Sequence, residues 1–455
     1  MPPPFTPLTS LLVDPAAARV HEEGWQSWSP SGAYALAATP YRPTNDNWAT
    51  VSHRPGRTVP AGTFQGEGLL ALDPGDGSPV RLWAAADPPH AVPSIRLAVR
   101  EGRAEVSADG PVTEHSHPPG PDGIQGALAA WADGLGLPAP RRAPTVWCSR
   151  YEHFNAVTED DIRENLTAMD ALALPVDVVQ IDDGYQSALG DWLTLSGRFT
   201  SRAGLAATIR ARGRRAGIWT APFLVDPRSE LATVHPDWLV RTSDGSPLLA
   251  GRNRGHDLYV LDTTHLAAAA YLIEVFAVLR IEGYDYFKVD FLYAGALDGI
   301  RQSGADALAA YREGVALIRE AIGPDAYLLG CRAPILPSIG LFDALRVSPD
   351  TAPHRHPETE DFGQPGLDRA EFTGTGRQWQ HGRLWVNDPG RLMARHPVES
   401  RERWAAYLET TGGLMASSDR LLSLDDWGLT TTRRLLGASS LSAASAPSSI
   451  GADHQ

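Results

Sequence analysis

Two charged residues stand two positions apart in an otherwise apolar stretch, and their types and spacing suit covalent catalysis. The stretch runs from Tyr284 to Phe291, has the pattern of a buried strand and contains Lys288 and Asp290. Side chains two positions apart on a strand point to the same face, so the ammonium would lie beside the carboxylate. A neighbouring cation favours the ionised form of a carboxylate, which is the form that acts as a nucleophile. A structural ion pair at a strand end explains the same two residues equally well.

Acidic residues also follow other predicted strands. From Thr145 to about Arg420, apolar segments alternate with helical patterns, which favours a (β/α)₈ barrel. The eight predicted strands are 145–150, 177–181, 217–222, 286–291, 327–331, 344–347, 384–386 and 413–416. Acidic residues lie at five of their C-terminal ends, namely Asp182 and Asp183, Asp290, Asp350, Asp388 and Asp419. Because barrel active sites form at these ends, the pattern predicts one site that combines these carboxylates.

Helical patterns lie between many of these strands, for example at 158–172, 205–215, 264–281 and 305–322. The first begins with Thr158 followed three residues later by Asp161, which resembles a capping box with Asp in place of Glu.

The first 140 residues have a different pattern. Short apolar runs at 33–37, 68–72, 80–84 and 95–99 are separated by Pro and Gly, which is typical of an antiparallel β-sandwich. Trp25 and Trp28 stand among polar residues, so we expect a loop there, and packing between domains would explain both rings. The fold class is therefore α/β, with an N-terminal β-sandwich at 1–140 and a (β/α)₈ barrel at 141–436. Residues 437–455 are rich in Ser and predict a disordered tail.

Composition excludes several classes of protein. The 455 residues carry a formal net charge of -14, which argues against nucleic acid or an anionic membrane as the main partner. Only two cysteines, Cys148 and Cys331, are present, so no disulfide framework is possible. The sequence begins without a positively charged leader and has no apolar run long enough for a membrane span. We therefore expect a cytoplasmic protein. No phosphate-binding glycine loop or zinc motif occurs.

A series of motifs in one order is more specific. The order is Trp147-Cys148-Ser149, Gln180-Ile181-Asp182-Asp183-Gly184, Gly217-Ile218-Trp219, Lys288-Val289-Asp290-Phe291, Gly330-Cys331, Arg346 with Pro349-Asp350, and Trp385-Val386-Asn387-Asp388-Pro389. From about His21 to Arg420 the chain resembles glycoside hydrolase family 36, the α-galactosidases or melibiases of clan D, and in particular its bacterial branch. The stretch from Gly24 to Trp28 resembles the N-terminal β domain of that branch.

The resemblance implies an exo-acting, retaining α-galactosidase that needs no cofactor or metal and acts on oligosaccharides. Asp290 corresponds to the nucleophile and Asp350 to the general acid/base, which must be protonated until attack. In a retaining pair the two carboxyl groups stand roughly 5 to 5.5 Å apart. The other implied substrate-binding residues are Asp182, Asp183, Lys288, Arg346, Trp219, Cys331 and one of Trp25 or Trp28. For Arg346 a structural ion pair is the alternative role, and for Cys331 it is a buried apolar thiol.

The sequence also departs from the family pattern. Arg150 replaces the usual Trp, Arg332 stands where Gly is frequent, and Gly390 replaces Asp. A guanidinium at position 150 would lower the pKa of the acid/base or occupy the pocket. No C-terminal β domain follows the eighth strand, so self-association would cover the exposed helices. Three alternatives stay open: galactosyl transfer, α-N-acetylgalactosaminidase activity, and a carbohydrate-binding protein without turnover.

Overall fold

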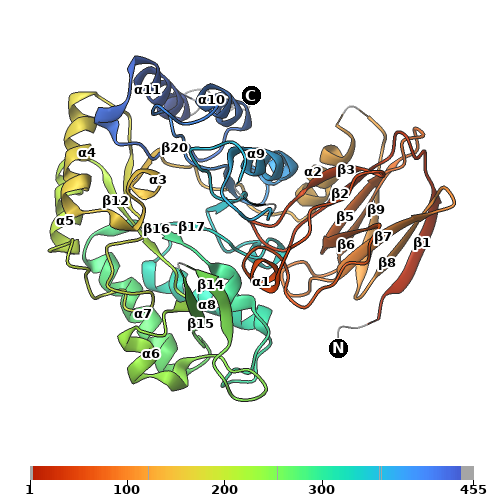
Figure 1. Cartoon of the computed structure of the whole chain (residues 1–455), viewed down its shortest axis with the longest axis horizontal. Coiled ribbons are helices and arrows are strands. Elements are labelled where there is room, and N and C mark those ends of the chain that lie inside the picture. Colours follow the sequence, from red (N-terminus) through yellow and green to blue (C-terminus); the bar gives the residue numbers. More distant parts are fainter. Residues whose placement is uncertain (1–3, 121, 254, 358, 360, 442–455) are drawn as a thin grey trace, which may run out of the picture.

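In the computed structural model, two domains lie side by side and share a long junction (Figure 1). The structure describes residues 4–120, 122–253, 255–357, 359 and 361–441, and the side chains as far as 438. Within this part of the chain, no helix combines the length and the apolar character that crossing a membrane requires.

The N-terminal domain is a β-sandwich of two antiparallel sheets. One sheet has the strand order β1 (Thr6–Leu12), β8 (Arg103–Ala108), β7 (Ser94–Arg100) and β4 (Thr63–Glu67). The other has the order β3 (Gly32–Ala35), β2 (Arg19–Glu22), β5 (Leu69–Asp73), β6 (Val80–Ala85) and β9 (Val112–His117). Helices α1 (Asp46–Ser52) and α2 (Gly123–Gly134) complete the domain. The facing strands bury an apolar core that includes Leu70, Trp83 and Leu97.

The second domain contains eight parallel strands, which confirms the predicted fold class. Their order is β19 (Val386–Asp388), β18 (Ala344–Arg346), β17 (Tyr327–Gly330), β16 (Tyr284–Val289), β12 (Arg215–Thr220), β11 (Val178–Ile181), β10 (Val146–Cys148) and β20 (Ala416–Ser417). Strands of a parallel sheet are buried on both faces, and β11 is accordingly an unbroken apolar run except for Gln180. The barrel closes where the Leu414 amide donates to the Asn387 carbonyl over 2.9 Å.

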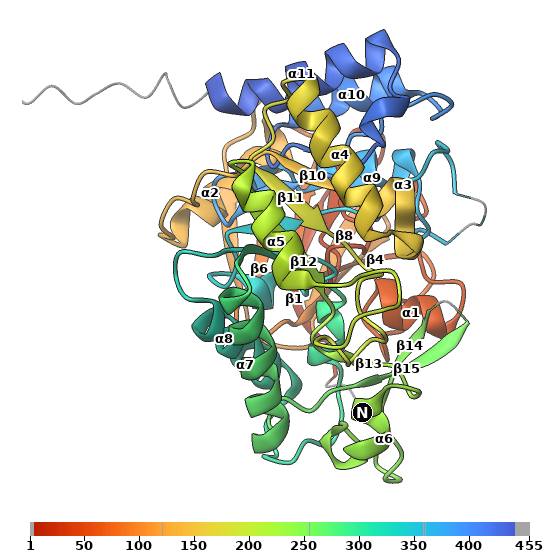
Figure 2. The same ribbon diagram turned by 90° about the vertical axis from the view of Figure 1, so that its left-hand side faces the viewer.

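Helices cover the outer face of this sheet, as Figure 2 shows for α4 (Glu159–Ala171), α5 (Arg202–Ala211), α7 (Leu266–Ile281) and α8 (Ala307–Ile322). The Thr158 side chain caps α4 and forms the predicted capping box with Asp161. Helix α8 buries Tyr311, Val315 and Ile318 on one face and ends at Gly323, where φ is +76°.

Three further helices follow, α9 (Leu367–Gly376), α10 (Arg401–Thr411) and α11 (Asp426–Leu441). Helix α11 therefore continues five residues past the predicted domain end at 436, and residues 442–455 of the predicted tail lie outside the described part. The short helices α3 (Arg150–His153) and α6 (Glu230–Val234) stand at the ends of loops.

A small antiparallel sheet extends the barrel toward the first domain. It consists of β13 (Leu224–Val225), β15 (His256–Val260) and β14 (Leu249–Asn253). Strand β14 contacts α1, where the Arg252 amide donates to Asn47 Oδ1 over 2.6 Å. The second domain thereby holds the helix that carries Trp48.

The two domains are joined by a buried ion pair between Arg377 and Glu23. Arg377 Nε lies 2.8 Å from Glu23 Oε1, and both side chains are fully buried. The same guanidinium donates to the carbonyls of Gln26, Ser27 and Val347. Burial alone would raise the pKa of Glu23, but the charge of Arg377 holds that pKa below its ordinary value. Arg377 thus fixes the loop that contains Trp28 against the end of β18.

We predict that Arg377→Met destabilises the protein by about 3–5 kcal/mol, because it leaves the Glu23 carboxylate buried without its cation. Urea unfolding followed by circular dichroism measures this change. Arg383→Met is the matched control, since Arg383 pairs with the exposed Asp133, and we expect a loss of at most about 1 kcal/mol. Equal losses in the two variants would contradict the role assigned to the buried pair.

Candidate active site

A cavity of about 230 Å³ lies at the C-terminal ends of the barrel strands. It is small beside pockets for drug-sized ligands, which span roughly 300–1,000 Å³, and it suits a single sugar ring. Its walls combine four carboxylates, four aromatic rings and two guanidinium groups. They are Asp182, Asp183, Asp290 and Asp350, Trp28, Trp48, Trp219 and Phe291, and Arg150 and Arg332, together with Asn253 and residues 363–365.

Lys288 connects two of these carboxylates from beneath the cavity. Its Nζ atom lies 3.0 Å from Asp182 Oδ2 and 3.7 Å from Asp290 Oδ2, and its side chain is buried. Burial would lower the pKa of Lys288, but Asp182 and Asp290 raise that pKa well above its ordinary value. The predicted pair of Lys288 and Asp290 is thus part of a triad whose nearer acid is Asp182. The pattern of β16 could not reveal this, because Asp182 follows β11.

The Asp290 carboxylate is held by two neutral donors. Trp219 Nε1 donates to Oδ2 over 3.0 Å, and the Phe291 amide donates to Oδ1 over 2.7 Å. Phe291 has a φ of +54°, a left-handed conformation that is unfavourable for a residue with a side chain. That backbone turn ends β16 and brings the Phe291 amide to Asp290. The carboxylate is therefore oriented before any substrate binds.

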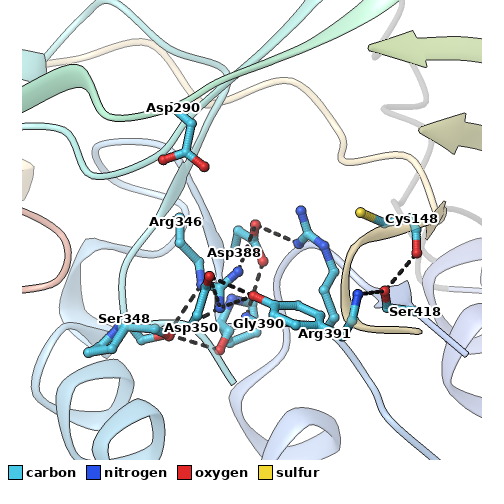
Figure 3. A network of polar contacts seen from close by, with 12 residues as sticks. Cys148, Asp290, Arg346, Ser348, Asp350, Asp388, Gly390, Arg391 and Ser418 are labelled. Atoms are coloured by element: carbon cyan, nitrogen blue, oxygen red, sulfur yellow. Dashed lines mark hydrogen bonds and ion pairs between the residues drawn. The ribbon is translucent and has the colours of Figure 1, made fainter. Parts of the chain in front are cut away.

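Asp350 lies at the end of β18 and has a different set of partners (Figure 3). The Tyr151 hydroxyl donates to Asp350 Oδ1 over 2.6 Å, and Arg346 Nη2 lies 3.5 Å from the same oxygen. Burial would raise the pKa of Asp350, but Arg346 and then Arg150 lower it below its ordinary value. We expected Asp350 to stay protonated before attack, but its surroundings favour the ionised form. Arg150 thus lowers the pKa of Asp350, which is the direction that the sequence predicted.

Asp182 and Asp183 both reach the cavity, as we expected of adjacent residues at a strand end. Asp182 also accepts from Gln180 Nε2 over 2.7 Å. Its pKa is lowered, because Lys288 and Arg150 outweigh the effect of burial. Asp183 accepts from Gln186 Nε2 over 2.8 Å and lies 3.7 Å from Arg150 Nη1. The cavity therefore presents carboxylate oxygens as hydrogen-bond acceptors on the side of β11.

Three predicted residues lie one layer behind the cavity wall. Lys288, Arg346 and Cys331 are at most 3% exposed, and none of them is among the wall residues. Burial and the charge of Asp290 raise the pKa of Cys331 well above its ordinary value, so its thiol stays neutral. Figure 3 shows Arg346 beside Asp350 and Asp388, and Arg391 Nη1 pairs with Asp388 over 2.6 Å.

Of the two tryptophans in the N-terminal loop, Trp28 borders the cavity. Trp25 does not, because its ring lies beneath the Arg54 guanidinium, 4.7 Å from ring centre to Cζ, within the first domain.

Sequence reasoning missed Trp48, Asn253 and Tyr151 as site residues. Tyr151 stands two residues after the strand motif at 147–149, which was the available signal, whereas Trp48 lies on a helix of the other domain. Within the described part of the chain, no cluster of three or more His, Cys, Asp or Glu side chains is arranged to hold a metal ion.

Comparison with known proteins agrees with this geometry. The sequence model of the Melibiase family matches residues 147–308. AgaA, an α-galactosidase of Geobacillus stearothermophilus, is 31% identical over 153 residues, which cover 32% of this chain and 20% of AgaA. The bifunctional α-galactosidase/sucrose kinase AgaSK of Mediterraneibacter gnavus is 28% identical over 166 residues, or 33% of this chain and 17% of AgaSK. The matched stretch thus spans a fifth or less of these curated relatives.

Solved structures resemble a much larger part of the chain. TtGalA, the α-galactosidase of Thermus thermophilus, superposes with a TM-score of 0.79 at 33% identity over 95% of this chain and 87% of its own. It was solved with p-nitrophenyl α-D-galactopyranoside and with stachyose. The AgaA structure gives a TM-score of 0.65 at 14% identity over 95% of this chain and 62% of its own, which shows a shared fold.

A sandwich domain beside a parallel barrel, with carboxylates and aromatic rings around a sugar-sized cavity, defines a glycoside hydrolase. The chain belongs to the melibiase family of α-galactosidases, which confirms the resemblance to glycoside hydrolase family 36.

We predict that Arg150→Met moves the basic limb of the pH profile of kcat/KM to higher pH. Arg150 lowers the pKa of Asp350, so Asp350 loses its proton at a lower pH when the guanidinium is present. Removing the charge raises this pKa, and the acid form persists to higher pH. The measurement is hydrolysis of a phenyl α-galactoside across pH.

Arg163→Met serves as the control for this profile, because Arg163 pairs with Glu159 on the surface of α4. We expect its basic limb to coincide with that of the unmodified protein. A limb that stays in place or moves to lower pH in Arg150→Met would contradict the electrostatic role of Arg150.

Proposed function

We propose that this protein is an exo-acting, retaining α-galactosidase that releases terminal α-D-galactose from oligosaccharides through a covalent glycosyl-enzyme intermediate. The observation that carries the proposal is the pairing of a fixed carboxylate, Asp290, with a second carboxylate, Asp350, in a cavity that suits one sugar. The stachyose and nitrophenyl galactoside complexes of TtGalA support a small α-galactoside as substrate.

Asp290 is the nucleophile in this mechanism. Its carboxylate attacks the anomeric carbon and forms an ester bond to the sugar, while the bond from that carbon to the leaving oxygen breaks. The Trp219 indole and the Phe291 amide prevent the carboxylate from rotating away, and Lys288 supplies a positive charge at 3.7 Å. The carboxylate therefore needs little reorientation to react.

Asp350 is the general acid and then the general base. It donates its proton to the leaving oxygen in the first step, and as a carboxylate it takes a proton from the attacking water in the second. Tyr151 and Arg346 both contact its Oδ1 atom, so they stabilise the carboxylate that the first step generates. Water then cleaves the ester, and Asp290 leaves as a carboxylate.

Acceptors on the side of β11 select the sugar. Asp182 and Asp183 present carboxylate oxygens that can accept hydrogen bonds from O4 and O6 of galactose. Lys288 would donate toward O3 and O4 from below. A site that is built to bond a hydroxyl rejects an analogue that lacks it there by about 10⁴-fold. The axial O4 of galactose would meet these acceptors, whereas the equatorial O4 of glucose would not.

The buried second layer favours galactose over N-acetylgalactosamine. Arg346 and Cys331, the expected neighbours of O2, are at most 1% exposed and are closely surrounded by protein. Arg346 also donates to the Pro349 carbonyl over 3.1 Å and therefore cannot move aside easily. An acetamido group at C2 would have to enter this buried layer behind the cavity wall.

We predict that the protein hydrolyses p-nitrophenyl α-galactoside, and that Asp290→Asn lowers kcat by at least about 10³-fold, because the neutral amide is a poor nucleophile. The α-glucoside and the α-N-acetylgalactosaminide should react far more slowly. Proton NMR of the first-formed sugar should show α-galactose, the product of a retaining reaction.

Asp285→Asn is the matched control for this substitution, because Asp285 lies on the same strand and pairs with Arg215 at a half-exposed site. We expect it to keep most of the activity. No release of nitrophenol by a folded protein would refute the proposed hydrolysis. First-formed β-galactose would instead refute retention, and galactosylated acceptors in place of free galactose would identify a transferase.

A further inference from the structure

Arg332 occupies a strained position in the wall of the cavity. It follows Cys331 at the end of β17, and its φ of +49° lies in the left-handed region, which residues with a side chain rarely adopt. Its neighbour across the cavity wall, Phe291, has the same kind of backbone with a φ of +54°. Strained residues persist where the surrounding structure holds them, and they often have a functional role. The mechanism proposed above does not use Arg332.

Two aromatic rings hold the Arg332 guanidinium in place. Its Cζ atom lies 3.4 Å from the ring centre of Trp28 and 4.2 Å from that of Phe291. Trp28 is itself fixed, because its amide donates to Gln26 Oε1 over 3.1 Å. A guanidinium held over aromatic rings keeps its N–H groups available at the edge of its plane. Burial raises the pKa of Tyr293 and the charge of Arg332 opposes that rise, so the Tyr293 hydroxyl is a polar neighbour of the guanidinium.

The guanidinium of Arg332 lies outside the ion pairs that join the other charged groups of the site. Lys288 pairs with Asp182 and Asp290, Arg346 lies at Asp350, and Arg150 lies at Asp183. In the part of the chain that the structure describes, Arg332 forms no ion pair with an Asp or Glu side chain. The cavity wall therefore holds one preorganised cation that no described carboxylate contacts, and an anionic group of a ligand could pair with it.

The strand order places this cation on the side of the leaving group. Strand β17 lies between β16, which leads to Asp290, and β18, which leads to Asp350. Strand β11, with the acceptors proposed for O4 and O6, lies two positions beyond β16. Since Asp350 protonates the leaving oxygen in the proposed mechanism, the group bonded to that oxygen would extend past the end of β17, where Arg332 stands in the cavity wall.

We propose that Arg332, held between Trp28 and Phe291, forms a subsite for a carboxylate on the leaving group, so that the preferred substrates are α-galactosides of acidic aglycones such as uronic acids. A planar guanidinium matches a planar carboxylate with two parallel hydrogen bonds, which suits this ligand better than a neutral hydroxyl. This inference rests on the proposed α-galactosidase function.

The test compares two substrates that differ in charge, 4-carboxyphenyl α-galactoside and its neutral methyl ester, 4-(methoxycarbonyl)phenyl α-galactoside. For each enzyme the ratio of kcat/KM for the acid to that for the ester is measured, and we expect Arg332→Gln to lower this ratio about tenfold. The acid-to-ester ratio of the unmodified protein is then divided by that of the variant. This division removes the difference in intrinsic reactivity between the two leaving groups. Arg332→Gly, which also relieves the left-handed backbone, should lower the ratio equally.

Arg252→Gln controls for general attraction of anions, because Arg252 is an exposed cation on β14 that pairs with Asp257, and its ratio should match that of the unmodified protein. An unchanged ratio in both Arg332 variants would overturn the inference while leaving the galactosidase assignment intact. If neither substrate reacts, the assigned function fails instead. The binding of the same two compounds, measured by quenching of Trp fluorescence, then decides whether Arg332 distinguishes acid from ester.

Discussion

The site depends on one buried ammonium group that two carboxylates share. Removing a lone charge from water costs several kcal/mol, so Lys288 can be buried only because Asp182 and Asp290 stand beside it. These acids follow β11 and β16, which are separated by β12. The parallel register places Trp219 of β12 opposite Lys288, and its indole reaches Asp290. Barrel geometry and charge compensation therefore fix the Asp290 carboxylate together.

A second buried ion pair makes the first domain part of the site. Arg377 holds Glu23 and the carbonyls of the loop that contains Trp28, and the same guanidinium contacts the Val347 carbonyl three residues before Asp350. Trp28 and, through α1, Trp48 then form part of the cavity wall. The N-terminal domain is thus part of the site, because it supplies two of the four aromatic rings that line the cavity. This explains why the junction contains polar groups that are fully buried.

Sequence reasoning succeeded where one element determines the outcome. The alternation within 284–291 placed Lys288 and Asp290 on one face, and the eight apolar segments matched the eight barrel strands. It failed where partners come from distant elements, as for the pair of Lys288 and Asp182 or the stack of Arg332 on Trp28. The edge strands β1 and β9 were also missed, because they are largely exposed and contain polar residues in place of an apolar run. The sequence could not show that Trp48 lines the cavity and Trp25 does not, because only the packing of the domains decides which ring borders the cavity.

The proposed mechanism makes Asp350 the general acid, yet Arg346 and Arg150 favour its carboxylate form. A lower pKa, however, also makes the carboxyl a stronger acid toward the leaving oxygen, and sugar alcohols are poor leaving groups. In the proposed mechanism, Tyr151 and Arg346 would stabilise the carboxylate that remains after the proton has gone, and that carboxylate would be the base of the second step. The cost is a smaller protonated fraction at neutral pH. The same cations thus favour the transfer of the proton and restrict the pH range in which it is available.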